Sequence, residues 1–141
     1  MMEIRNGHYC IYQGKEYNLT QDEHMNTIIY TRNRDLADET FCVEEVYGTV
    51  YEKVIDPEEI QEAYRISTKA IIDGDELSIC RAPGGAEDMY WVESDSKELK
   101  EKYNMKEIDR GVYGTWIEKD RVQVVERKTN VNHLYKKTKN P

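Results

Sequence analysis

The amino-acid sequence predicts a mainly β protein with short helices, built from two related β-rich halves. Three observations lead to this fold class: an internal duplication, closely spaced strand-and-turn patterns, and eleven tyrosines beside one phenylalanine and two tryptophans. Tyrosine suits pleated, half-buried surfaces, because its ring is apolar while its hydroxyl stays in water. Two SH3-like small barrels and one joint sheet both satisfy these observations, and a mixed α+β sheet is the alternative.

The duplication emerges when the chain is aligned with itself. With a shift of 60, residues 11–35 match residues 71–95 without gaps, and five of the aligned pairs are identical. With a shift of 66, VYGTVYEK at 46–53 matches VYGTWIEK at 112–119 at six of eight positions. A repeated sequence indicates a repeated structural unit, so the limits of the repeats predict the limits of the domains. We predict a first repeat over residues 1–66 and a second over residues 67–129.

Both repeats contain the pattern of a β-hairpin followed by further strands. IIDGDELSI contains Asp73-Gly74, a strong hairpin-turn pair, and IYQGKEYNL contains Gln13-Gly14 at the matching place. Runs of β-branched and aromatic residues with alternating polarity predict the remaining strands. These runs are TIIYTR (27–32), VYGTVYEKVI (46–55), MYWVE (89–93), VYGTWIEK (112–119) and RVQVVERKT (121–129).

Helix-start signals precede three short segments. Asp56 is a capping residue followed by Pro57, so we predict an acidic helix over 57–64 that has no counterpart in the second repeat. A short helix is predicted over 96–103, with Asn104 as its stop. The other start boxes are Asp35-x-x-Asp38 and Asp95-x-x-Glu98.

The ends of the chain and its cysteines predict a cytoplasmic protein. The N-terminal sequence has no basic stretch followed by an apolar core, and no apolar run approaches the about 18 residues of a membrane helix. Cys10, Cys42 and Cys80 are far apart and form no CxxC pair, so we expect three reduced, mostly buried thiols. Residues 130–141 are expected to form a loose basic tail.

The net charge of −8 is concentrated in one segment. Residues 35–62 contain ten acidic residues and a single basic residue, Lys53, whereas the rest of the chain is nearly balanced. Apolar residues alternate with these acids, so we expect a folded segment whose carboxylates form one negative patch. Such a patch attracts a basic partner and speeds the encounter. A solvated face that keeps the protein soluble is the simpler alternative.

Catalytic and cofactor-binding motifs are not recognisable in the sequence. The three histidines are scattered, and no histidine or cysteine has metal-ligand spacing. The glycine-rich segment 82–86 lacks the Lys-Ser/Thr of a phosphate-binding loop, so it predicts a connection between strands. We therefore predict a protein that is not an enzyme and has no cofactor or metal. Its basic residues are not clustered as nucleic-acid binding requires.

These features favour a protein-binding module that grips a basic protein through its acidic segment. In size, acidity and lack of catalytic motifs, with the acidic run 35–62, the chain resembles the small acidic immunity proteins that bacteria make alongside polymorphic toxins. The resemblance implies that the partner is a toxin domain, such as a cationic nuclease. The residues predicted to contact it are Glu44, Glu45, Tyr47, Tyr51, Asp56, Glu58, Glu59 and Glu62.

The aromatic residues of the two repeats support an alternative function. Because successive side chains of a strand point to opposite faces, Tyr90 and Trp91 cannot both lie in the core. One of them is expected at the surface or between the halves, where an aromatic ring beside acids would make a binding anchor. The alternative is thus a small regulatory or ligand-binding module with an aromatic-lined site between the halves. The oligomeric state is left open.

Overall fold

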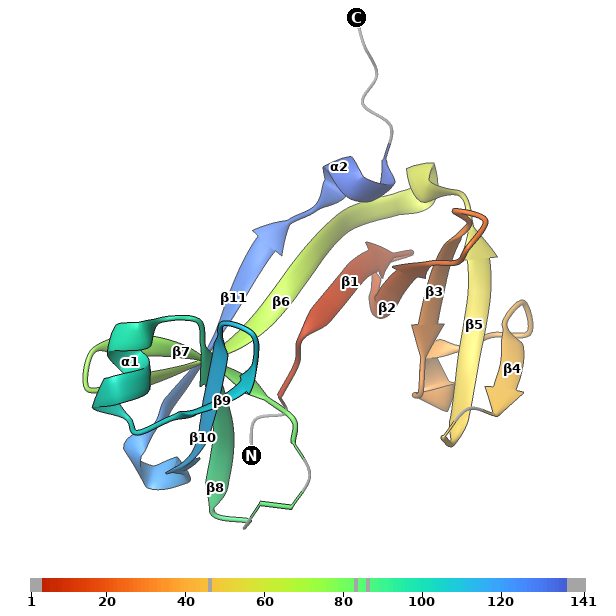
Figure 1. The fold of residues 1–141 in the computed structure, drawn as a ribbon. Coiled ribbons are helices and arrows are strands. Elements are labelled where there is room, and N and C mark those ends of the chain that lie inside the picture. Colours follow the sequence, from red (N-terminus) through yellow and green to blue (C-terminus); the bar gives the residue numbers. More distant parts are fainter. Residues whose placement is uncertain (1–3, 46, 83, 86, 137–141) are drawn as a thin grey trace, which may run out of the picture. The chain divides into compact units, whose positions relative to one another are not determined.

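The computed structural model describes residues 4–45, 47–82, 84–85 and 87–136, and these residues form a mainly β chain with short helices (Figure 1). The predicted fold class is therefore confirmed. The strands are β1 (Gly7–Tyr12), β2 (Lys15–Gln21), β3 (Thr27–Thr31), β4 (Cys42–Glu45), β5 (Thr49–Ile55), β6 (Ile60–Ile72), β7 (Asp75–Cys80), β8 (Met89–Ser94), β9 (Lys106–Asp109), β10 (Val112–Glu118) and β11 (Gln123–Asn130).

The described chain has five helical segments, four between strands and one after β11, and each is only one or two turns long. They are the 3₁₀ turns η1 (Arg34–Leu36), η2 (Pro57–Glu59) and η3 (Lys119–Arg121) and the α-helices α1 (Lys97–Lys102) and α2 (Asn132–Tyr135). None of the helices formed by the described residues is long and apolar enough to cross a membrane.

The eleven strands of the described residues join one antiparallel sheet that is not closed into a barrel. Their order is β4-β5-β3-β2-β1-β6-β7-β8-β10-β9, and β11 pairs with β6 beside this path. Closing a barrel would require the first and last strands of the order to pair, whereas β4 and β9 stand at its two ends. Of the predicted architectures, the joint sheet is correct, and the SH3-like barrels and the α+β sheet are wrong.

The described residues divide into two compact units. The first unit contains Gly7–Ile66 and the described chain from Lys128 onward, and the second contains Ser67–Arg127 and the described residues before Gly7. The strand order is β4-β5-β3-β2-β1-β6 in the first unit and β9-β10-β8-β7-β6-β11 in the second. Strand β6 contributes its first half to one unit and its second half to the other. The duplication therefore extends over six strands.

The strand registers show that the cores of the two units are equivalent. Leu19 lies opposite Ile29 in the first unit, and Ile79 lies opposite Val92 in the second, and all four are buried. Alternate residues of each strand face the core, which keeps these apolar side chains on one face of the sheet. The first core contains Cys10, Tyr12, Tyr17, Leu19, Ile29, Ile55, Ile60, Ala63 and Val131. The second contains Ala70, Ile72, Leu77, Ile79, Val92, Met105, Tyr113 and Ile117.

The densest sequence match between the repeats is not a structural match. Tyr47 lies in the β4–β5 turn with a φ of 50°, whereas Tyr113 lies within β10 and is 5% exposed. In the strand pairing, Lys53 lies opposite Ile29 of β3, and Thr115 lies opposite Val92 of β8. Because Ile29 and Val92 are equivalent core positions, Lys53 is the structural counterpart of Thr115. The sequence alignment instead matched Lys53 with Lys119, four positions further on.

Both predicted hairpin turns form with the same geometry. The residues of Gln13-Gly14 have φ values of 51° and 76°, and those of Asp73-Gly74 have φ values of 49° and 85°. Two successive positive φ angles are the mark of a type I′ turn, whose twist matches that of the flanking strands. The matching turns fix the registers of β1 with β2 and of β6 with β7.

The start boxes predicted at Asp35 and Asp95 lie at the beginnings of η1 and α1, although neighbouring residues provide the caps. Ser96 caps α1 in place of Asp95, and Asn33 caps η1 in place of Asp35. In both cases a short side-chain oxygen accepts a hydrogen bond from a free N–H of the first turn. Helix α1 stops before Asn104, as predicted, and this residue has the left-handed φ of 53° that asparagine tolerates.

The helix predicted over 57–64 is wrong beyond its first turn. Asp56 and Glu59 form the predicted capping box, but η2 ends at Glu59 and β6 begins at Ile60. From there the chain has many β-branched residues and pairs with β1, so sheet formation overrides the local helix signal. The second repeat has η3 at the corresponding place, so the first repeat has no extra element.

The loose tail predicted over 130–141 is wrong for its described part. Val131 is buried in the first core, and the Asn132 side-chain oxygen accepts the Ala63 N–H at 2.6 Å. Lys136 Nζ donates to the carbonyl oxygen of Ile60 at 2.9 Å, so this segment packs onto β6. The remaining residues 137–141 lie outside the described residues, as do Val46 of the predicted strand 46–55 and Pro83 and Ala86 of the glycine-rich segment.

Candidate protein-binding surface

The eight residues predicted to contact a partner form two separate groups in the first unit. Strand β5 spans seven residues, so at about 3.3 Å per residue its two ends, beside the β4–β5 turn and beside η2, are roughly 20 Å apart, and Tyr51 lies in its first half. Figure 1 shows η2 at the head of β5 and the β4–β5 turn at its tail. The single negative patch expected over 35–62 is therefore wrong. The hairpin group is Glu44, Glu45, Tyr47 and Tyr51. The other group is Asp56, Glu58, Glu59 and Glu62.

The carboxylates of Asp56, Glu59 and Glu62 in the second group are engaged in local structure. The Asp56 carboxylate accepts the Glu58 N–H at 2.9 Å, and the Glu59 carboxylate accepts the Asp56 N–H at 3.3 Å. Glu62 forms an ion pair with Lys128 at 3.2 Å. Caps and ion pairs place these carboxylates beside positive partial or full charges, which weakens the field that they present to a partner.

The hairpin group lies at the outer edge of the sheet. All four residues of β4 are exposed, and β4 is the first strand in the sheet order. Its pairing with β5 sets Val43 opposite Tyr51, which is half-buried, and Glu44 opposite Val50. Because neighbouring residues of a strand face opposite ways, Glu44 and Glu45 carry negative charge to both faces of this edge. Val43 is 58% exposed, so an apolar side chain lies in water beside the two carboxylates.

The β4–β5 turn presents an aromatic ring to solvent. Tyr47 is 99% exposed, and Gly48, with a φ of 105°, completes the turn after it. Arg32 Nη1 donates to the Tyr47 carbonyl oxygen at 3.2 Å, and the Thr49 hydroxyl donates to the Glu45 carboxylate at 3.1 Å. Tyrosine offers a large contact area at low cost in side-chain entropy. A hydrogen-bonded turn that carries such a ring is a preformed anchor for a partner.

The charge on the outer surface of the hairpin is mainly negative. Glu44, Glu45 and Glu52 lie on its strands. The basic residue of β5, Lys53, lies opposite the buried Ile29, and its ammonium is 5.3 Å from the ring centre of Tyr12. Its hydrogen bond to Tyr12 raises the pKa of Lys53, which therefore stays charged. That charge faces the aromatic rings of the first core, so it does little to offset the carboxylates at the edge.

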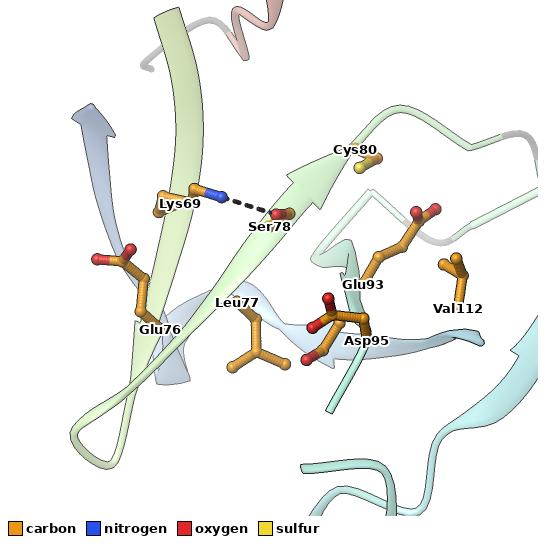
Figure 2. A pocket seen from close by; sticks show the side chains of 9 residues that line it. Lys69, Glu76, Leu77, Ser78, Cys80, Glu93, Asp95 and Val112 are labelled. Atoms are coloured by element: carbon orange, nitrogen blue, oxygen red, sulfur yellow. Dashed lines mark hydrogen bonds between the residues drawn. The ribbon is translucent and has the colours of Figure 1, made fainter. Parts of the chain in front are cut away.

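The second unit has a different surface feature, a recess of about 400 Å³ on the sheet face opposite its core (Figure 2). A cross-strand row of Lys69, Ser78 and Glu93 lines it. Lys69 Nζ donates to the Ser78 hydroxyl at 2.9 Å. Figure 2 shows this lysine on one side of the recess and Glu93 with Asp95 on the other. Glu76 lies beside Lys69 and is paired with Arg127 at 2.6 Å, so the Lys69 side is positive on balance and the opposite side is negative.

The matching face of the first unit is filled by aromatic rings. Its equivalent row consists of Tyr9, Asn18 and Tyr30. The Tyr9 ring stacks on that of Tyr64 with a centroid distance of 6.4 Å, and the Tyr64 hydroxyl donates to Glu16. Large rings in the first unit thus replace the lysine and glutamate that border the recess in the second.

Trp91 lies on the recess face, as strand alternation requires. Tyr90 packs against the second core, so Trp91 points to the other face, and the prediction that one of this pair leaves the core is confirmed. The Trp91 indole N–H donates to Glu93 at 2.7 Å, and its ring stands edge-on to that of Trp116 at 5.1 Å. The ring also covers Gly114, where an added Cβ would come within 2.3 Å of it.

Sequence reasoning missed the residues whose role depends on register. Lys69, Ser78 and Glu93 lie on three different strands and become neighbours only when all three ladders are known. Val43 was also missed, although its place in a short strand before a turn is a signal for an exposed edge position. Tyr47 was included for its residue type, but its full exposure follows from its place in a turn, because β5 begins at Thr49, three residues later than the predicted strand.

The three thiols have different surroundings. Cys10 is buried, and burial raises the pKa of its thiol to about 12. Cys80 borders the recess, where burial and the Glu93 carboxylate raise its pKa. Both thiols are protonated at neutral pH and so are poor nucleophiles. Cys42 is exposed on β4, contrary to the expectation of mostly buried thiols. Within the described chain, no three His, Cys, Asp or Glu side chains are grouped to hold a metal ion.

Comparison with known proteins gives a family but no activity. A family model described as "Uncharacterised conserved protein UCP033725" matches residues 4–134, which is nearly the whole chain. That description names no ligand, partner or reaction. No curated protein and no solved structure matches the chain. Function must therefore be inferred from the hairpin and the recess themselves.

Proposed function

The chain belongs to the family of uncharacterised conserved proteins UCP033725, and we propose that it is a non-enzymatic protein-binding module for a basic partner. The β4–β5 hairpin is its contact surface. The observation that carries this proposal is the presence of Glu44, Glu45 and the fully exposed Tyr47 on one edge hairpin. Carboxylates steer a basic protein at long range, and an exposed aromatic ring gives the contact its short-range anchor.

A narrower form of the proposal is an immunity protein that acts in the cytoplasm. The acidic character and size that suggest this resemblance belong to the whole chain, and the hairpin is the part that would enter a toxin. Two carboxylates facing opposite sides of a narrow edge suit a cleft whose walls are basic. In a cationic nuclease such a cleft binds substrate phosphates, and the hairpin carboxylates would take the place of those phosphates.

The test begins with capture of a partner on the immobilised full chain and continues with the purified partner. We expect a protein of positive net charge, encoded beside the gene for this chain. Its affinity should fall at least about tenfold when salt rises from about 50 to about 300 mM, through slower association. Charge reversal with Glu44→Lys and Glu45→Lys should weaken binding by at least about tenfold.

The second unit offers a matched control for this variant. Glu107→Lys with Asp109→Lys changes the net charge by the same amount, on the equivalent edge strand β9, whose residues are also exposed. We expect this control to bind within about threefold of the unmodified chain, because it changes the net charge and leaves the β4–β5 hairpin unaltered. Equal losses in both variants, or an acidic partner, would contradict the proposal.

A second candidate function is binding of a small polar ligand in the recess of the second unit. It is favoured by the arrangement of Lys69 on one side and Glu93 with Asp95 on the other, which suits a molecule with both a carboxylate and an ammonium group. Titration with γ-aminobutyrate should then shift the NMR amide signals of Ser78 and Glu93, and Lys69→Met should abolish these shifts. Shifts that are absent or spread over both units would rule this ligand class out.

A further inference from the structure

We infer that the outer edge of β4 binds its partner by strand addition, with a basic β-strand of the partner pairing antiparallel or parallel to Cys42–Glu45. This inference rests on the proposed function and specifies how the hairpin makes contact. It assigns three roles: backbone pairing to β4, charge pairing to Glu44 and Glu45, and anchoring to Tyr47.

The backbone of β4 is available on one side. The strand pairs with β5 through the register Cys42 to Glu52 and Glu45 to Thr49. Among the described residues, no strand pairs with its other side, because β4 begins the sheet order. An edge strand of this kind offers a row of N–H and C=O groups to solvent, and an extended segment of another protein can bond to them.

The side chains of β4 select the chemistry of the added strand. Residues directly opposite each other in neighbouring strands lie side by side on the same face. Glu44 is on one face and Glu45 on the other, so an added strand needs lysine or arginine on both of its faces to pair with them. Val43 lies next to these positions and is 58% exposed, so it favours an apolar residue opposite it. The expected strand therefore has two adjacent basic residues, one on each face, and an apolar residue beside them opposite Val43.

The same side chains disfavour a second copy of this chain as the occupant. Pairing β4 with another β4 would bring four carboxylates, two from each copy, into one short ladder. Like charges in neighbouring positions destabilise a strand pair. Charged side chains on natural edge strands prevent self-association by this repulsion. The same carboxylates attract an incoming strand that is basic.

Tyr47 extends the contact beyond the end of β4. It is separated from Glu45 by a single residue, and its ring is almost fully exposed. The Arg32 hydrogen bond to its carbonyl holds the turn in place, so ordering this loop costs a partner little entropy. The equivalent edge, β9, carries Lys106 with Glu107 and Asp109, and its turn has no aromatic residue. The structure thus favours β4 over β9 as the edge that receives a basic strand.

The experiment uses the full chain and a synthetic peptide of about eight residues in which each valine is followed by two adjacent lysines, so that lysines lie on both faces of the strand. A control peptide has the same sequence with every backbone nitrogen methylated, which keeps its charge and removes its N–H donors on both edges of the strand. We expect hydrogen exchange of β4 amides to slow at least about tenfold with the first peptide, and the control to bind at least about tenfold more weakly. Tyr47→Ser should weaken binding about fivefold, and Glu44→Lys with Glu45→Lys at least about tenfold.

The possible failures separate the binding mode from the proposed function. Equal binding of the two peptides, or slowed exchange at β9 instead of β4, would overturn strand addition while leaving an acidic binding surface in place. Binding that is unaffected by Tyr47→Ser would also overturn it, because the ring is assigned as the anchor. If neither peptide binds and no basic partner is captured, the proposed function fails together with the inference. All the substituted side chains are exposed, so folding of the variants is expected and can be checked by circular dichroism.

Discussion

The two repeats share one strand order but expose different chemistry. In the first unit, tyrosine rings close the outer face of the sheet, and the exposed acidic and aromatic groups lie at the edge hairpin. In the second unit, that face carries the Lys69 to Glu93 row and stays open as a recess, while the edge strand has charges of both signs. Backbone pairing needs only a buried apolar row to stay in register. The other face of each copy was therefore free to diverge toward a separate role.

The largest expected difference between the repeats concerns two tyrosines that the sequence alignment places together. Tyr113→Ala should lower the free energy of unfolding by about 3–5 kcal/mol, because it empties space in the second core. Tyr47→Ala should change it by less than about 0.5 kcal/mol, because its ring touches little but water. Urea denaturation followed by circular dichroism measures both. Similar losses in the two variants would mean that the alignment, and not the ladder register, describes the repeat.

A smaller difference is expected where Trp91 covers Gly114. Gly114→Ala should cost about 1–3 kcal/mol, because the new methyl group displaces the ring and strains the Trp91 hydrogen bond to Glu93. The equivalent position of the first unit is Glu52, and Glu52→Ala should cost less than about 0.5 kcal/mol. Tryptophan fluorescence reports the first change directly, since both tryptophans belong to the second unit. An unshifted emission spectrum in Gly114→Ala would show that the ring does not rest on this glycine.

The contacts of Glu16 and Glu76 sharpen the comparison further. These two residues are equivalent, and Glu16 accepts the Tyr64 hydroxyl whereas Glu76 pairs with Arg127 at 2.6 Å. Tyr64→Phe should cost about 1 kcal/mol, because it removes a hydrogen bond from a buried hydroxyl to a carboxylate. Arg127→Met should cost less, at most about 0.5–1 kcal/mol, because its ion pair is largely exposed. Thermal unfolding of both variants measures the two losses of stability. A larger loss in Arg127→Met than in Tyr64→Phe would contradict this prediction.

The smallest expected effect is a dependence on pH in the second unit. The Asp75 carboxylate accepts hydrogen bonds from Lys102 at 2.5 Å and Tyr103 at 2.7 Å, and these bonds lower the pKa of Asp75. A carboxyl with a lowered folded pKa stabilises the fold above its unfolded pKa of about 4, and this stabilisation is lost as the pH falls through the folded pKa. Asp75→Asn should therefore destabilise the chain at pH 7, but not at a pH below the folded pKa of Asp75, where the carboxyl is protonated.

The matching residue of the first unit is Lys15, so that unit has no such carboxyl. Urea denaturation at a series of pH values, followed by tryptophan fluorescence, should show the difference between Asp75→Asn and the unmodified chain narrowing below about pH 4. A difference that is constant across the acid range would show that the two hydrogen bonds do not depend on the charge of Asp75.

Local patterns predicted the strands and the hairpin turns, because Asp73-Gly74 and alternating β-branched residues act over a few positions. They failed at 57–64, where Asp56 and Pro57 are correct signals for one turn but the sheet recruits Ile60 onward. Pairing with a strand that is distant in the sequence determines the secondary structure of such a segment, and local sequence rules do not include this pairing. The candidate surface was partly predicted, since residue type identified Glu44 and Glu45. Which carboxylates share a surface depends on the length and direction of β5, so the acidic run alone could not separate the hairpin from the η2 group.

The C-terminal segment has a consequence for how the chain is made. Val131, Asn132 and Lys136 complete the first unit, although its strands β1 to β5 leave the ribosome long before these residues are synthesised. During that delay the first core lacks its last apolar side chain, and Ala63 lacks its hydrogen-bond acceptor. Domains normally fold in the order of synthesis. Here the half that is translated first reaches its finished form last, so a released chain truncated after residue 127 should be more susceptible to proteolysis in its first half than in its second.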